Sequence, residues 1–233
     1  MKARIIKTVF VEAARRLPGV LPDGEGYTGD RYRIDLIAEG AIDPDIGWVV
    51  DYGDMKRFFD PVRKQLDHCC LNDIPELAAD ASVEALEQWI NKRLRPWPEW
   101  FAGARVSPCG TDIFILHTLP PDDILDLPER AAFSFSAAQA LPQLPEGHPC
   151  RNLHGHNYVV EVAAEAMDRL TPALMDIHGA LHASYLNRIS GLEQATAERI
   201  AAWIWDRLVE RGMMPVVVAV QETPYNRCHY YGG

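Results

Sequence analysis

The chain has 233 residues, of which 48% are hydrophobic and 24% are charged, a composition typical of soluble globular proteins and unlike that of disordered or fibrous ones. Asp and Glu total 33 and Lys and Arg total 23. The net charge of −10 argues against a nucleic-acid-binding protein, because neutralising phosphate groups requires a surplus of basic residues.

The sequence also argues against a membrane or secreted protein. No apolar stretch approaches the roughly 18 residues that a membrane-spanning helix needs, and Glu12 interrupts the apolar run behind the basic N-terminus, so we expect no signal peptide. The five cysteines are odd in number and sparse, unlike a disulfide framework. We therefore expect a cytoplasmic protein with reduced cysteines and no membrane partner.

The two halves of the chain repeat each other. Four short patterns recur in the same order, at an offset that falls from 124 to 114 residues, which indicates a duplication. The matched segments are 13–18 (AARRLP) with 137–142 (AAQALP), 21–24 (LPDG) with 144–147 (LPEG), 71–74 (LNDI) with 186–189 (LNRI), and 84–94 with 198–208. We predict two homologous domains, residues 1–118 and 131–233, joined by a proline-rich linker at 119–130.

In each copy the hydrophobic pattern predicts the order strand, strand, helix, helix, strand, strand. Residues 4–16 and 31–40 alternate between apolar and polar side chains, which predicts two antiparallel strands. The apolar residues between Met55 and Leu66 then follow the 3.6-residue period of an amphipathic helix.

The second copy carries clearer boundary signals. Residues 157–165 are predicted as a strand. Thr196 is a good N-cap residue for a helix that Gly212 ends. The continuous apolar run at 215–223 predicts a buried strand.

His154-Gly155-His156 stands just before the predicted strand at 157–165. The two-residue period of a strand would place both imidazoles on one face, where they could share a metal ion. The alternative is a pair of surface histidines beside a turn. Cys150 lies four residues earlier, and it is either a thiolate base or nucleophile beside a metal or an imidazolium, or a buried apolar residue.

Two further motifs could contribute to a site. In Asp67-His68 the carboxylate could orient an imidazole for acid–base catalysis. Glu222 ends the apolar run at 215–223. In a pocket its carboxylate could accept two N–H bonds from a guanidine-like ring edge, whereas in solvent it would have no such role.

Together and in this order, these motifs resemble the 6-pyruvoyltetrahydropterin synthase / 6-carboxytetrahydropterin synthase family, and more closely the bacterial 6-carboxytetrahydropterin synthases of queuosine biosynthesis. The resemblance covers nearly the whole chain as two family units. In the second copy it rests on 135–138 (FSAA), 145–150 (PEGHPC), 153–158 (LHGHNY), 221–223 (QET) and 228–232 (CHYYG). In the first copy it rests on 45–52 (DIGWVVDY) and 66–75 (LDHCCLNDIP).

The resemblance implies an α+β fold with two tandem T-fold (tunnelling-fold) units, each a four-stranded antiparallel sheet with two helices on one face. It also implies a role for each matching residue. These are His154, His156 and, at the place of a third histidine, Gln139 for the metal; Cys150 for the thiol base; Asp67 and His68 for the acid–base pair; and Glu222 for anchoring the pterin.

The two copies depart from the family pattern in complementary ways. The first copy has Arg15, Thr28 and Asp30 at the metal positions and Pro108 at the place of the anchoring Glu, but it keeps the Asp-His pair. The second copy keeps the histidine pair, the thiol and the Glu, but residues 181–183 (LHA) replace Leu-Asp-His. We therefore expect one complete site per chain, assembled from both copies either within one chain or between chains.

The resemblance implies a lyase that acts on 7,8-dihydroneopterin triphosphate, most consistently a 6-carboxy-5,6,7,8-tetrahydropterin synthase that combines metal-assisted proton abstraction with triphosphate elimination. We expect one Zn²⁺ per chain, with another divalent metal as the alternative. The alternative functions are 6-pyruvoyltetrahydropterin synthase or another pterin enzyme of this fold, and a non-catalytic pterin-binding or structural protein. We expect a homo-oligomer, since sheet edges must be covered, and favour a trimer over an assembly of dimers.

Overall fold

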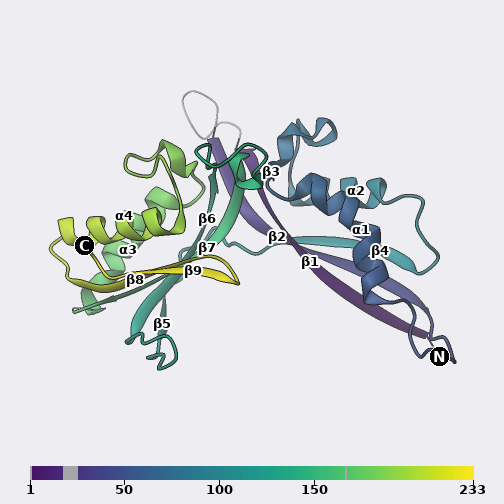
Figure 1. Ribbon diagram of the computed structural model, residues 1–233, viewed down its shortest axis with the longest axis horizontal. Coiled ribbons are helices and arrows are strands. Elements are labelled where there is room, and N and C mark those ends of the chain that lie inside the picture. The colour runs from purple at the N-terminus through teal and green to yellow at the C-terminus, as the bar shows by residue number, and fades with distance from the viewer. Residues whose placement is uncertain (1, 18–25, 166) are drawn as a thin grey trace.

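The computed structural model describes residues 2–17, 26–165 and 167–233. It consists of two α+β halves side by side, each a sheet with two helices on one face (Figure 1). The α+β prediction with two helices per sheet is confirmed. The repeat segment 21–24 lies outside the described residues. None of the helices in the described part of the chain has the length and apolar character needed to cross a membrane.

The N-terminal half is built on a long hairpin. Strands β1 and β2 pair antiparallel from Lys2↔Ala41 to Leu17↔Gly26, and the sheet order is β3-β1-β2-β4. The pairing of β3 with β1 is parallel, a detail that the expected purely antiparallel sheet lacks. The elements of this half are β1 (Lys2–Leu17), β2 (Gly26–Ala41), α1 (Tyr52–Leu66), β3 (Cys69–Cys70), α2 (Val83–Arg93) and β4 (Phe101–Pro108).

The C-terminal half has a five-stranded sheet in the order β5-β6-β7-β8-β9, in place of the four strands expected. The additional strand is β5, which pairs antiparallel with β6 and covers its edge. The segment predicted as a linker, 119–130, runs between these two strands. The elements are β5 (His117–Leu119), β6 (Arg130–Gln139), β7 (His154–Ala164), α3 (Leu170–Leu181), α4 (Ala197–Glu210), β8 (Pro215–Thr223) and β9 (Asn226–Tyr230).

The helix boundaries follow from capping and burial. The Thr196 hydroxyl accepts a hydrogen bond from the backbone N–H of Arg199 at 3.4 Å, as an N-cap residue should. Gly212, just beyond the end of α4, has a φ of +71°, a conformation that glycine adopts without strain. Both predicted boundary signals of this helix are therefore confirmed, and the strand predicted at 215–223 matches β8.

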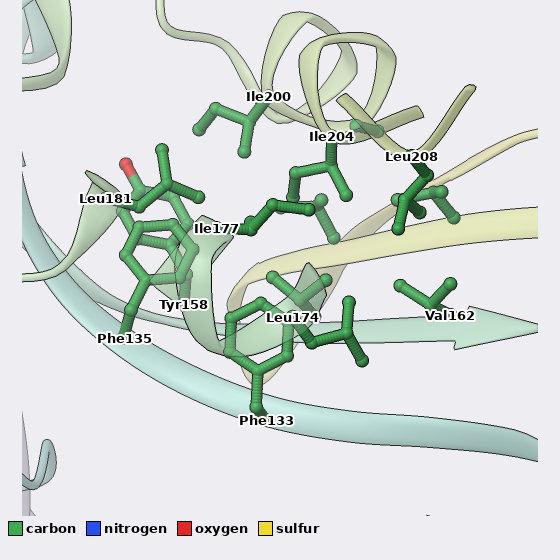
Figure 2. Close-up of a cluster of buried hydrophobic side chains, with 14 of the residues drawn as sticks. Phe133, Phe135, Tyr158, Val162, Leu174, Ile177, Leu181, Ile200, Ile204 and Leu208 are labelled. Carbon is green, nitrogen blue, oxygen red and sulfur yellow. The ribbon is translucent and has the colours of Figure 1, made fainter. Parts of the chain in front are cut away.

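Each half has its own hydrophobic core between the sheet and its helices. Figure 2 shows the C-terminal core, in which aromatic side chains of β6 and β7 meet aliphatic side chains of α3 and α4. Phe135 and Tyr158 stack with ring centroids 4.8 Å apart. Along β6 and β7, every second residue faces the helices. The residues that alternate with these core residues point away from the helices, toward the other half.

The two halves meet where β1 and β2 pack across β6 and β7 (Figure 1). Gly29 and Gly155 occupy equivalent places in the two repeats and touch here. A Cβ added to Gly29 would lie 2.1 Å from the Gly155 Cα, and one added to Gly155 would lie 2.0 Å from the Gly29 Cα. This close approach brings the ends of the two hairpins together and positions the candidate site.

Candidate active site

The histidine pair lies at the start of β7. The strand begins at His154, so the two-residue period places both rings on one face, with centroids 4.9 Å apart. The rings are 0% and 2% exposed, which excludes the alternative of two surface histidines beside a turn. A buried imidazole pair needs polar partners, and the neighbouring strands supply them.

Glu222 and Gln139 reach the histidines from the two flanking strands. Gln139 ends β6 directly opposite His154, is 0% exposed, and its Nε2 donates a hydrogen bond to Glu222 Oε1 at 2.6 Å. Glu222 Oε1 also lies 3.1 Å from His156 Nε2. The donor atoms of His154, His156 and Glu222 all lie within 4.8 Å of one another.

The first half supplies His68 to the same centre. Its ring centroid is 4.8 Å from that of His154, and the donor atoms of His68, Cys150 and His154 lie within 4.8 Å of one another. His68 follows α1 with a φ of +59°, and its backbone N–H donates to the Glu12 carbonyl at 2.7 Å. The parts from the two copies thus meet within one chain.

Asp67 orients His68. One carboxylate oxygen lies 3.3 Å from His68 Nδ1 and accepts the backbone N–H of Glu12 at 3.1 Å, while Arg63 donates to the other at 3.0 Å. Hydrogen bonds with Asp67 and Cys150 raise the pKa of His68 to about 10, against the effect of burial. Burial acts to raise the pKa of Asp67, but the bonds from His68 and the Glu12 N–H hold it below its ordinary value. These contacts favour the imidazolium form of His68.

Glu12 and Arg31, which were not predicted as site residues from the sequence, connect the halves behind the histidines. The Glu12 side chain accepts from His156 Nδ1 at 2.9 Å and from Arg31 Nε at 2.6 Å. Arg31 also donates to the backbone carbonyl of Glu222 at 2.8 Å. The one signal in the sequence was that Glu12 is an acidic residue inside an apolar strand, beside the repeated Ala-Ala. Nothing in the local sequence identifies its partner His156, which lies 144 residues away.

The pKa values of His154 and His156 are shifted in opposite directions. Burial acts to lower the pKa of His156, but its contacts with the Glu12 and Glu222 carboxylates raise it to about 9. Burial, together with the nearby charge of His156, lowers the pKa of His154 to about 3. His154 Nδ1 lies 2.8 Å from the Asn152 carbonyl, which can only accept, so the neutral ring carries its proton there and its Nε2 has a free lone pair.

These residues fit a divalent metal ion. Among the described residues, both groups of His, Cys and carboxylate side chains close enough to share an ion belong to this centre. Two buried atoms in it, His156 Nε2 and Gln139 Oε1, have no hydrogen-bond partner in the described part of the chain. Imidazole, carboxylate and thiolate are the ligands that zinc takes in proteins.

The equivalent place in the other repeat differs. There, Arg15, Thr28 and Asp30 line a cavity of about 200 Å³ together with Ser136 from the second half. Burial raises the pKa of Asp30 to about 6, while its carboxylate accepts the Gly110 N–H at 2.9 Å. With no imidazole pair in the lining, this cavity lacks the donor set found around His154.

The two α+β halves thus share one buried centre that combines imidazoles, a thiol and carboxylates. The sequence profile described as 6-pyruvoyl tetrahydropterin synthase matches residues 4–100 and 130–233, and the chain belongs to this family. It is therefore a lyase of this family's type.

Two relatives match about two-fifths of the chain. The 6-carboxy-5,6,7,8-tetrahydropterin synthase of Synechocystis sp. is 38% identical over 117 residues, which are 42% of this chain and 88% of that protein. The dihydroneopterin monophosphate aldolase of Pyrococcus furiosus is 33% identical over 95 residues, which are 41% and 77% of the two chains. The solved 6-pyruvoyl tetrahydropterin synthase of Caenorhabditis elegans aligns over 53% of this chain and 100% of its own, at 20% identity and a TM-score of 0.39.

Proposed function

We propose that this enzyme acts on 7,8-dihydroneopterin triphosphate as a 6-carboxy-5,6,7,8-tetrahydropterin synthase. The observation that carries the proposal is the meeting of His68 from the first half with Cys150 and His154 from the second. The Synechocystis relative of that name supports the choice of reaction. Membership of an enzyme family argues against the non-catalytic alternative.

Cys150 and His68 form the proton-transfer pair of the proposed reaction. An imidazolium beside a thiol stabilises the thiolate, which can take a proton from a carbon of the substrate side chain. Asp67 keeps His68 charged and fixes its ring, so that the imidazolium can return a proton as the triphosphate leaves. The base and the acid thus lie next to each other, within reach of the same substrate atoms.

His154 and His156 would hold the proposed zinc ion. When bound, the ion supplies Lewis-acid polarisation of a substrate oxygen. Glu12 fixes the orientation of the His156 ring through Nδ1, and Asn152 does the same for His154. We also propose that Glu222 contacts the pterin, since its carboxylate is part of the same centre.

A second candidate reaction is an aldolase-type cleavage of a dihydroneopterin. It is favoured by the aldolase name of the Pyrococcus relative and by Gln139, which stands where the family motif has a histidine. The same thiolate and imidazolium could serve it, because cleavage of a carbon–carbon bond next to a hydroxyl also requires proton removal and return.

The test is product analysis by mass spectrometry after separate incubation with dihydroneopterin triphosphate and dihydroneopterin monophosphate. We expect 6-carboxytetrahydropterin, acetaldehyde and triphosphate from the first compound, with one water molecule consumed. Turnover of the monophosphate alone would instead establish the aldolase reaction, and 6-pyruvoyltetrahydropterin without acetaldehyde would identify the third reaction of this family. Cys150→Ala should abolish the product, whereas Cys109→Ala, which removes an exposed thiol, should not.

A further inference from the structure

We infer that Glu222 is the third protein ligand of the metal centre, beside His154 and His156, and that Gln139 holds this carboxylate instead of binding the metal. The inference rests on the metal centre of the proposed function and names its ligand set. It gives this chain two imidazoles and one carboxylate where the family motif has three histidines.

The first step concerns the ring nitrogens that face the centre. His154 Nδ1 lies 2.8 Å from the Asn152 carbonyl, and His156 Nδ1 lies 2.9 Å from Glu12 Oε2. Both partner atoms are acceptors only, so each Nδ1 carries a proton. The Nε2 atoms are left for the centre, where the donor atoms of His154, His156 and Glu222 lie within 4.8 Å of one another, as the ligands of one ion do.

The second step concerns the contact between His156 and Glu222. His156 Nε2 is buried, lies 3.1 Å from Glu222 Oε1, and has no hydrogen-bond partner among the described residues. A nitrogen lone pair and a carboxylate oxygen at this distance repel each other unless a proton or a metal ion lies between them, and a bound metal ion takes the place of the proton. Two ligand atoms that are each about 2.0 Å from a tetrahedral zinc ion lie about 3.3 Å apart, close to the distance found here.

The third step concerns Gln139. Its Nε2 is 2.6 Å from Glu222 Oε1 and is the atom of the side chain nearest to His154, at 3.4 Å from Nε2 of that ring. An amide NH₂ has no lone pair for a metal, and the opposite amide orientation would place two oxygens against each other. A neutral amide oxygen is also a poor zinc ligand beside imidazole. Gln139 is therefore a positioning residue for the carboxylate.

Glu222 is held from a second side. Arg31 donates to its backbone carbonyl at 2.8 Å and is itself held by Glu12 at 2.6 Å. The recorded contacts of the Glu222 carboxylate with Gln139 and His156 both use Oε1, so Oε2 can still accept a hydrogen bond from the substrate. Three protein ligands are the number typical of catalytic zinc sites, which keep one position open.

The test compares metal binding by chelator-treated variants of the full chain, with Zn²⁺ in calorimetry and Co²⁺ in absorption spectroscopy. Glu222→Gln should weaken Zn²⁺ binding more than 100-fold, because a ligand is lost, and should alter the Co²⁺ spectrum. Gln139→Ala should weaken binding about 10-fold, in the range measured for residues that orient ligands, and keep the spectrum. Glu210→Gln makes the same chemical change on the exposed surface of α4 and should change neither.

Two outcomes would overturn the inference. One is wild-type zinc affinity in Glu222→Gln, with circular dichroism showing the variant folded. The other is a thiolate-to-cobalt charge-transfer band that disappears in Cys150→Ala, since Cys150 would then be the third ligand. Metal binding is measured without substrate, so failure of the product assay with the expected metal data would reject only the proposed reaction.

Discussion

His68 and Cys150 come from opposite halves of the chain and lie in contact across the junction. Under the proposed function these two side chains are the base and the acid of one proton-transfer pair. Glu12 has a parallel task on the metal side, where it orients His156 from the other half. Each copy thus contributes side chains that contact the proposed catalytic or metal-binding residues of the other copy.

We predict that Cys150→Ala and His68→Ala each lower kcat by at least 10²-fold, the lower end of the range for acid–base groups, without changing metal content. Since both residues belong to one site within one chain, mixing the two variants under conditions of subunit exchange should restore no activity. The measurement is turnover of the mixture against each variant alone. Recovered activity would show that the site forms between chains.

The charge of His68 should also be visible in the stability of the metal-free protein. The pKa of His68 is raised in the folded state, to about 10, compared with an ordinary value of 6.5. A raised pKa contributes stability that is fully present below pH 6.5 and is lost as the pH rises through 10.

We therefore expect His68→Gln to be less stable than the wild type at pH 6, with the difference closing by pH 10.5. Chemical denaturation of both metal-free proteins across this pH range measures the effect. A difference that stays constant with pH would mean that His68 stabilises the fold through packing and not through its charge.

At the scale of the elements, the crossing of the two hairpins decides the geometry of the site. Gly29 and Gly155 allow the two backbones to touch, and His154 and His156 flank one of these glycines. The parallel pairing of β3 with β1 then sets the turn after α1 beside Glu12. The short pairing of β3 with β1 thus places His68 beside Glu12.

We expect Gly155→Ala to destabilise the protein by about 1–3 kcal/mol or more, because its Cβ would overlap the Gly29 backbone and force the hairpins apart. Gly179→Ala is the matched control. A Cβ there meets no atom within 4 Å, and alanine favours the helix by about 1 kcal/mol. Thermal unfolding measures both changes, and a Gly155→Ala variant as stable as Gly179→Ala would contradict this account of the crossing.

At the scale of the whole molecule, the two repeats differ at equivalent places. The second repeat has the centre around His154 and His156, and the first has a cavity lined by Arg15, Thr28 and Asp30. Restoring histidines at Thr28 and Asp30 alone would not recreate the second centre, since Arg15 and Pro108 also differ. The chain therefore has the length of two family units, but among the described residues only one of its two equivalent places carries the side chains that could bind a metal ion.

We predict one bound metal ion per chain, not one per repeat, after zinc is supplied to gently purified protein. The reason is that the guanidinium of Arg15 and the hydroxyl of Thr28 are not typical zinc ligands, whereas imidazoles such as those of His154 and His156 are. Elemental analysis against protein concentration gives the ratio. Two ions per chain, or none, would contradict the assignment of the centre to the second copy.

The assembly stays a prediction. Strands β4 and β9 are at the ends of their sheets, and exposed sheet edges favour pairing with another chain. We expect a trimer of six T-fold units, which light scattering would record as three times the mass of one chain. A stable monomer at micromolar concentration would contradict this expectation.

Local chemistry was enough to predict the elements that depend on it. The cap at Thr196, the bounds of β8 and the shared face of His154 and His156 follow from hydrogen-bonding groups and periods that adjacent residues set. The repeat could also be identified from the sequence, because a duplication preserves the order of its motifs along the chain. Tertiary packing decided the rest. Glu12 beside His156 and the parallel strand β3 depend on backbones that meet far from one another in sequence, where no local period carries information about the partner. The meeting of His68 with Cys150 was expected only through the family resemblance, and the strand β5 has three residues, too few to show a strand period.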